Sequence, residues 1–198
     1  MSASRFEIAL LLLLLAGQFN VVNFDSPTVL NALNHWSGQR SGADVVRHYK
    51  EQLRKPVWLM GHSMGSISVT EAYKRLQDEK RAALVSGLIV SAGQNGTSLN
   101  GEATTLPVLV LHHEADPCVG NTVGHAKRIV TKLRDAGNLS ADLVLVSGGS
   151  SHGDPCRNGY HMYLGIEPEV AKVLDAFMSR HSATPAVETP SIPDETKQ

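Results

Sequence analysis

The sequence predicts an α/β protein with three layers (α/β/α), built on a mostly parallel sheet that helices cover on both faces. Two observations predict this fold class. Four short segments are almost wholly apolar, which is typical of strands buried on both faces of a sheet. Between most of them lie longer segments whose apolar residues recur at helical spacing, as the crossovers of parallel strands require. The four apolar segments are residues 56–61, 84–92, 106–113 and 142–147.

The first segment of the chain has two interpretations. Residues 8–16 form an apolar run that is shorter than the roughly 20 residues of a membrane-spanning helix. The run is either a buried helix or the apolar part of a signal peptide, so residues 1–18 are kept apart from the domain that follows. We expect no stable membrane span here.

The domain itself is expected over residues 19–181. It begins with a strand over residues 19–24, and a turn and a polar loop follow up to residue 40. Ser41 is a suitable N-cap for a first helix. Pro56 ends that helix, because proline cannot continue the helical hydrogen-bond ladder.

The elements that follow alternate. The loop between the second and third apolar segments, residues 93–105, is short and predicts a minimal lid. Residues 148–165 form a long Gly/Ser/Pro-rich loop, and the Pro/Thr/Glu-rich residues 182–198 are expected to be a disordered tail. Helices are expected over residues 64–78, 122–136 and 167–181.

Composition narrows the possible partners. Eighteen Lys and Arg residues against nineteen Asp and Glu residues give a formal charge of −1 in 198 residues. No basic cluster provides the electrostatic footprint of a nucleic-acid or anionic-membrane surface. We expect a small-molecule substrate, and the oligomeric state is left open.

One of two G-x-S-x-G sequences has the context of a nucleophile. The pattern is common by chance and occurs both at residues 61–65 and at residues 149–153. A nucleophilic serine needs a strand before it and a helix after it, so that a strained turn presents its hydroxyl at the end of the sheet. Ser63 has both neighbours, whereas the sequence after Ser151 cannot start a helix at once. The first turn of the helix would supply the N–H of Met64 to an oxyanion.

A serine nucleophile requires a base and a carboxylate that orients it. Ligands bind at the carboxyl ends of parallel strands, and Asp116 follows the apolar segment 106–113 directly. Glu114 is the competing acid but lies closer to the strand end. Two histidines compete as the base, His152 and His161, and their positions alone do not separate them.

A wider set of motifs carries a resemblance. Asn-Phe-Asp-Ser-Pro at residues 23–27, His-His-Glu-Ala-Asp-Pro-Cys at residues 112–118 and Tyr-His-x-x-x-Gly-Ile-Glu at residues 160–167 resemble a bacterial group of α/β-hydrolases. The match runs from about residue 19 to residue 180. The resemblance implies the α/β-hydrolase fold, and it implies that His161 rather than His152 is the catalytic histidine.

The two cysteines then gain a possible role. They are either two free thiols or one disulfide. Cys118 lies two residues after Asp116, and Cys156 lies five residues before His161. A bridge would join the acid loop to the base loop and stabilise the fold by ~3–4 kcal/mol on the chain-entropy model. It would also favour a periplasmic or secreted location.

The sequence departs from the family in one place. The family's pattern places a strand and a loop that donates a second oxyanion N–H before the first strand here, and that segment is not evident, as in an N-terminally truncated chain. The expected activity is hydrolysis of a carboxylic ester through an acyl-enzyme, without cofactor or metal. Thioester or peptide cleavage and acyl transfer remain open. The alternative is a catalytically impaired fragment that acts as a binding or scaffold domain.

Overall fold

The computed structural model describes residues 42–182 and confirms the predicted architecture. Four strands form one sheet in the order β1-β2-β3-β4, and every neighbouring pair is parallel. The strands are β1 (Trp58–His62), β2 (Gly87–Ser91), β3 (Val108–His113) and β4 (Ala141–Val146). The predicted strand over residues 19–24, the apolar run at residues 8–16 and the proposed tail beyond Ser182 lie outside the described residues.

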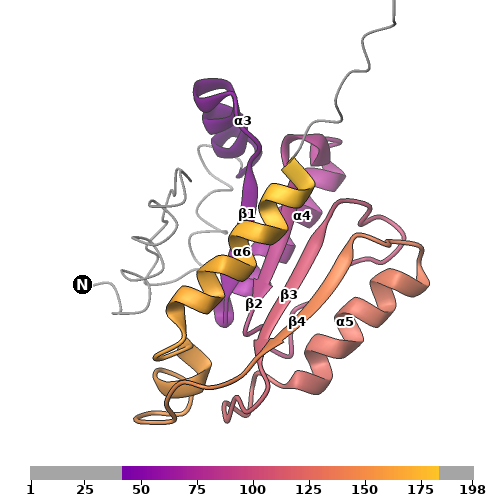
Figure 1. The fold of residues 1–198 in the computed structure, drawn as a ribbon. Coiled ribbons are helices and arrows are strands. Elements are labelled where there is room, and N and C mark those ends of the chain that lie inside the picture. The colour runs from indigo at the N-terminus through magenta and orange to yellow at the C-terminus, as the bar shows by residue number, and fades with distance from the viewer. Residues whose placement is uncertain (1–41, 183–198) are drawn as a thin grey trace, which may run out of the picture.

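Helices cover both faces of the sheet (Figure 1). The α-helices are α3 (Gly42–Leu53), α4 (Met64–Asp78), α5 (Val123–Asp135) and α6 (Glu167–Ser182). Two 3₁₀ turns are η1 (Ala82–Leu84) and η2 (Gly159–Met162). No helix within residues 42–182 is long and apolar enough to cross a membrane.

The core consists of two apolar clusters, one on each face of the sheet. Leu88 and Val90 of β2 pack in the cluster shared with α4 and α5, whereas Ile89 between them packs in the cluster shared with α6. This alternation follows from the two-residue repeat of a strand. The strands are therefore buried on both sides, which explains why they read as continuous apolar runs.

Most predicted element bounds agree with the structure to within a residue or two. The helix predicted over residues 64–78 matches α4. The strand predicted over residues 84–92 is shorter, because residues 82–84 form η1 before β2 begins at Gly87. Thr122 caps α5 by accepting a hydrogen bond from the backbone N–H of His125, and Gly137 follows the helix with a φ of 91°.

A charged cluster ties β4 to helices on both faces. The carboxylate of Asp142 in β4 lies 3.2 Å from Arg134 Nη2 of α5 and also pairs with Arg180 of α6. Both arginines are more than half exposed, so these ion pairs contribute modestly to stability.

Candidate active site

Ser63 occupies a strained turn between β1 and α4. Its φ of 52° and ψ of −121° place a non-glycine residue in a sparsely populated backbone region, at a cost of about 1–3 kcal/mol. Neighbouring groups hold the turn: the Ser63 N–H donates to Ser91 O at 2.9 Å, and Ser66 donates to Ser63 O from both its backbone N–H and its hydroxyl. The strand, the turn and the helix predicted around Ser63 are all present.

The two glycines that flank Ser63 differ in what they do. A Cβ added to Gly61 would lie 2.2 Å from Gly65 O, so only glycine lets the chain pass there. A Cβ added to Gly65 would meet no atom outside its own helix. Of the two glycines in the motif, only Gly61 is therefore required for steric reasons.

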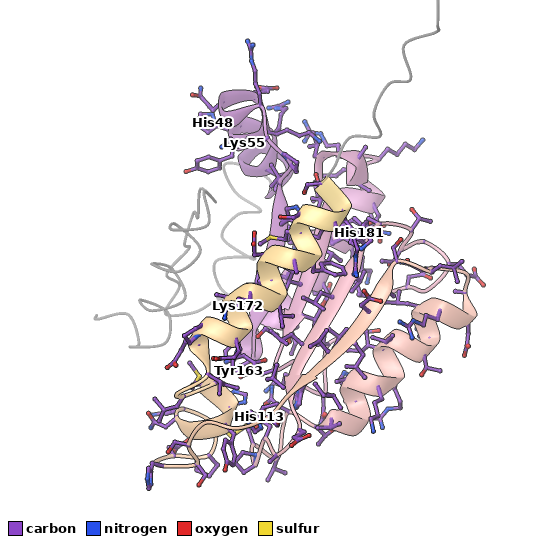
Figure 2. All side chains as sticks on the ribbon, in the orientation of Figure 1. His48, Lys55, His113, Tyr163, Lys172 and His181 are labelled. Atoms are coloured by element: carbon purple, nitrogen blue, oxygen red, sulfur yellow. A yellow bond between two sulfur atoms is a disulfide. The ribbon has the colours of Figure 1, made fainter. Side chains whose placement is uncertain are left out.

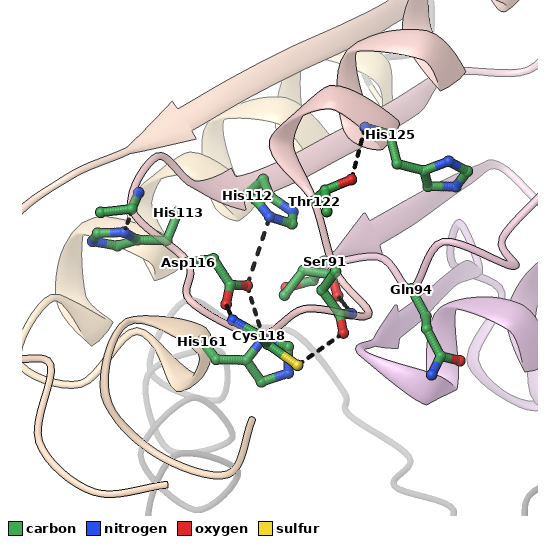
Figure 3. Close-up of polar contacts among 12 residues, drawn as sticks. Ser91, Gln94, His112, His113, Asp116, Cys118, Thr122, His125 and His161 are labelled. Carbon is green, nitrogen blue, oxygen red and sulfur yellow. Dashed lines mark hydrogen bonds and ion pairs between the residues drawn. The ribbon is translucent and has the colours of Figure 1, made fainter. Parts of the chain in front are cut away.

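Asp116 and His161 are brought together at the carboxyl end of the sheet. Asp116 lies in the loop after β3 and His161 lies in η2, and His161 Nδ1 is 2.8 Å from Asp116 Oδ2 (Figure 3). Neither side chain has solvent-exposed surface. The second carboxylate oxygen, Oδ1, accepts a hydrogen bond from the backbone N–H of Cys118 at 2.9 Å. The loop thereby orients the carboxylate toward the histidine.

This contact defines the protonation pattern of the His161 ring. An ionised carboxylate is an acceptor only, so Nδ1 carries the hydrogen and Nε2 of the neutral ring carries the lone pair. Nε2 is buried and makes no hydrogen bond with any residue from 42 to 182. The ring centroid of His161 lies 5.1 Å from that of His62, the residue that precedes Ser63. The histidine thus lies beside the Ser63 turn.

The competing candidates lie apart from this pair. Glu114, Ser151 and His152 are all exposed, and no helix begins directly after Ser151. Among the contacts of the described residues, none joins His152 or Glu114 to the Asp116–His161 pair. The structure therefore separates the two histidines that sequence position left even.

Met64 is the first residue of α4 and is 46% exposed. The N–H groups of the first helical turn have no acceptor within their own helix. The backbone N–H of Met64 is consequently available in the place where the sequence predicted an oxyanion donor.

Three contacts hold the acid loop, which follows β3 and carries Asp116, to the base loop, which lies between β4 and α6 and carries His161. Cys118 and Cys156 form the predicted disulfide, which spans 38 residues. His113 Nε2 lies 2.9 Å from Gly148 O, and its Nδ1 accepts from the backbone N–H of Ala115, so Nε2 is the donor. The His113 ring also stacks on Tyr160, with centroids 4.4 Å apart. Asp116 and His161 thus belong to loops that are fixed to each other.

The sequence did not single out two further histidines beside the pair. His112 Nε2 lies 3.6 Å from Asp116 Oδ2, on the oxygen that also binds His161. Burial lowers the pKa of His112, which favours the neutral form of this ring. His62 is the second, and burial together with the nearby His161 lowers its pKa to about 3. Its place inside the G-x-S-x-G sequence was the one available signal.

Among residues 42–182, no group of three or more His, Cys, Asp or Glu side chains is placed to hold a metal ion. A cavity of about 280 Å³ lies between the segments that precede β3 and β4, near residues 101–105 and 136–140. It is at the end of the strands opposite to Ser63.

Comparison with known proteins shows similarity of fold. No protein-family model and no curated protein sequence matches the chain. A monoacylglycerol lipase from Paleococcus ferrophilus superposes with a TM-score of 0.58 at 16% identity, covering 87% of this chain and 88% of the lipase. A putative alpha/beta hydrolase of unknown function from Agrobacterium tumefaciens gives 0.57 at 13% identity, covering 89% and 76%. An alpha-beta serine hydrolase homologue from Coxiella burnetii gives 0.51 at 17%, covering 85% and 75%. The chain has the α/β-hydrolase fold.

Proposed function

We propose that this chain of α/β-hydrolase fold is a serine hydrolase that cleaves a carboxylic ester through an acyl-enzyme. Ser63 is the nucleophile, His161 the base and Asp116 the carboxylate that orients the base. The observation that carries the proposal is the buried 2.8 Å contact between His161 Nδ1 and Asp116 Oδ2, beside a strained serine at a strand–helix turn.

The reaction follows the chemistry of these groups. The lone pair on His161 Nε2 takes the proton from the Ser63 hydroxyl while Oγ attacks the ester carbonyl. The imidazolium that forms is stabilised by the Asp116 carboxylate and then gives its proton to the leaving alkoxide. In the second half, His161 removes a proton from water, which attacks the acyl-enzyme; the imidazolium then returns that proton to Ser63 Oγ as the acid is released.

The oxyanion is assigned to the N-terminal end of α4. The backbone N–H of Met64 follows the nucleophile directly, and the helix dipole favours negative charge at that end. The loss of one oxyanion donor typically costs ~10²–10³ in rate. For this reason the second donor decides whether the chain is a fast or an impaired enzyme.

The second candidate function is a binding domain that retains the fold but not the turnover. The two candidates differ in one measurable property, since only an activated serine reacts rapidly with a fluorophosphonate.

The test is labelling of the full chain with a fluorophosphonate probe, followed by peptide mapping. The proposed function predicts covalent modification at Ser63, its loss in Ser63→Ala, and unchanged labelling in the matched control Ser151→Ala. Hydrolysis of 4-nitrophenyl acetate should likewise be lost in Ser63→Ala and unchanged in Ser151→Ala. Protein that is folded by circular dichroism yet neither labelled nor active would support the binding domain and reject the hydrolase.

A further inference from the structure

The side chains of Tyr163, Ser91 and His62 form a hydrogen-bonded row next to the Asp116–His161 pair. The Tyr163 hydroxyl donates to Leu111 O at 3.1 Å. Ser91 Oγ lies 3.0 Å from that hydroxyl and 3.1 Å from His62 Nδ1. Tyr163 lies at the same end of the molecule as His113, where the strands end (Figure 2). Tyr163 and Ser91 are both fully buried.

The number of hydrogens that these side chains can donate determines which group is the donor in each hydrogen bond. A carbonyl oxygen only accepts, so the single hydroxyl hydrogen of Tyr163 is used on Leu111. Ser91 must then donate to Tyr163, which uses the one hydrogen of the serine. His62 Nδ1 is therefore the donor to Ser91. In the neutral His62 ring, this row places the hydrogen on Nδ1.

The backbone places these groups together for two reasons. His62 and Ser91 are register partners at the ends of β1 and β2, so their side chains can meet on one face of the sheet. Tyr163 has a φ of 55°, and this left-handed conformation follows directly on η2, which carries His161. One short segment thus presents both His161 and the tyrosine that begins the row.

The ring of His62 is in contact with His161. Their centroids are 5.1 Å apart, and the Tyr163 ring packs edge-on against His62 at 5.7 Å. The hydrogen bond to Asp116 fixes the position of Nδ1, but the His161 ring can still rotate about the line that joins Nδ1 to Asp116 Oδ2. A second contact is needed to fix the direction of the Nε2 lone pair.

We infer that His62, anchored through Ser91 to Tyr163, is a positioning residue that fixes the ring of His161 for proton transfer. The inference rests on the proposed function for its effect on rate. His62 touches no reacting atom in this scheme and acts only through His161.

Charge also favours a neutral ring at this place. His161 becomes an imidazolium during the reaction, and a second cation 5.1 Å away would oppose that change. The charged or titratable groups that influence His62 are His161, Asp116 and His112. Burial, His161 and His112 lower the pKa of His62 to about 3 although Asp116 raises it, so His62 does not compete with His161 for the proton.

The first test is independent of turnover. Nitrogen NMR of histidine-labelled protein should show His62 with its hydrogen on Nδ1 in the wild type. Ser91→Ala should remove that preference and shift the ring signals of His161. Thr70→Val is the matched control, because Thr70 is an equally buried hydroxyl that bonds only within α4. Unchanged His161 signals in Ser91→Ala would overturn the inference.

The second test is a double-mutant cycle on ester turnover. Since small misplacements of a catalytic group cost up to ~10²-fold, His62→Leu should lower kcat by about that factor and Ser91→Ala by about 10-fold. KM should stay within about 3-fold, because substrate binding is not altered. Ser91→Ala should add no loss in the His62→Leu background. His62→Asn, whose amide can still donate to Ser91, should recover about 10-fold over His62→Leu.

The outcomes separate the two proposals. Losses that multiply in the double variant, or a loss confined to KM, would overturn the positioning role while leaving the hydrolase intact. A wild type with neither turnover nor labelling at Ser63 would reject the proposed function. The NMR comparison would still decide whether His62 positions His161.

Discussion

His161 donates from Nδ1 to Oδ2 of Asp116 across 45 residues of chain, and both side chains are completely shielded from solvent. In the proposed hydrolase the two loop histidines have unequal roles. The base is needed in both halves of the reaction, so His161→Ala should lower kcat/KM by ~10⁴-fold or more.

His152→Ala is the matched control for that variant, because His152 is exposed and lies in the same loop. It should cost less than ~10-fold, since a rim side chain contributes little to transition-state stabilisation. The two variants are compared in one ester assay at equal circular dichroism. A dead His152→Ala beside an active His161→Ala would show that the carry-over from the family motif is misaligned.

The Cys118–Cys156 bridge should be a main source of stability. Replacing both cysteines by serine should lower the free energy of unfolding by ~3–4 kcal/mol, because the open chain gains entropy. Urea denaturation measures this change. A reductant should destabilise the wild type by a similar amount and leave the double variant unaffected. Two free thiols in unreduced, denatured protein would contradict the bridge and remove the argument for an oxidising compartment.

The two glycines around Ser63 offer a matched pair. Gly61→Ala should be strongly destabilising, because the new Cβ meets a backbone oxygen that cannot move aside. Gly65→Ala should preserve stability or raise it by up to ~1 kcal/mol, since alanine favours the helical backbone. Thermal unfolding of both variants tests the difference. Equal losses at the two positions would mean that the turn does not depend on the close approach at Gly61.

Acid should destabilise the protein through His62. Its pKa falls from 6.5 to about 3 on folding, so between these values the unfolded chain binds the proton and the native state does not. Stability therefore decreases as the pH falls through this range, by roughly 1.4 kcal/mol per pH unit for one such histidine. The lowered pKa of His112 acts in the same direction.

Urea denaturation at pH 7, 6 and 5 would measure this dependence. Because asparagine does not titrate, the free energy of unfolding should decrease less steeply with falling pH in His62→Asn than in the wild type. Equal slopes in the two proteins would show that His62 is protonated in the native state.

The accuracy of the sequence-based predictions depended on how local each feature is. The strand, turn and helix around Ser63 could be predicted because this signal is contained in one short stretch of sequence. The choice between His152 and His161 required the resemblance, because it depends on which loop folds back onto Asp116. The row from Tyr163 through Ser91 to His62 was not predicted, because neither segment alone determines the register of β1 against β2.

The glycines illustrate the same limit on a smaller scale. The motif marks Gly61 and Gly65 equally, yet the steric demand arises from one carbonyl that approaches only Gly61. His113 ends the predicted strand over residues 106–113, and nothing in that segment indicates that its ring binds Gly148 and so fixes the acid loop to the base loop. Pairings of this kind are settled by tertiary contacts.

The ion pairs of Asp142 affect how readily copies of this protein associate through the edge of the sheet. β4 is the last strand on its side of the sheet formed by residues 42–182, and its outer backbone groups are a template for strand addition. Asp142, Arg134 and Arg180 place three charges at the start of this edge. An incoming chain would have to strip water from them, which disfavours edge-to-edge aggregation. Because salt screens exposed charges, this protection is weakest at high ionic strength.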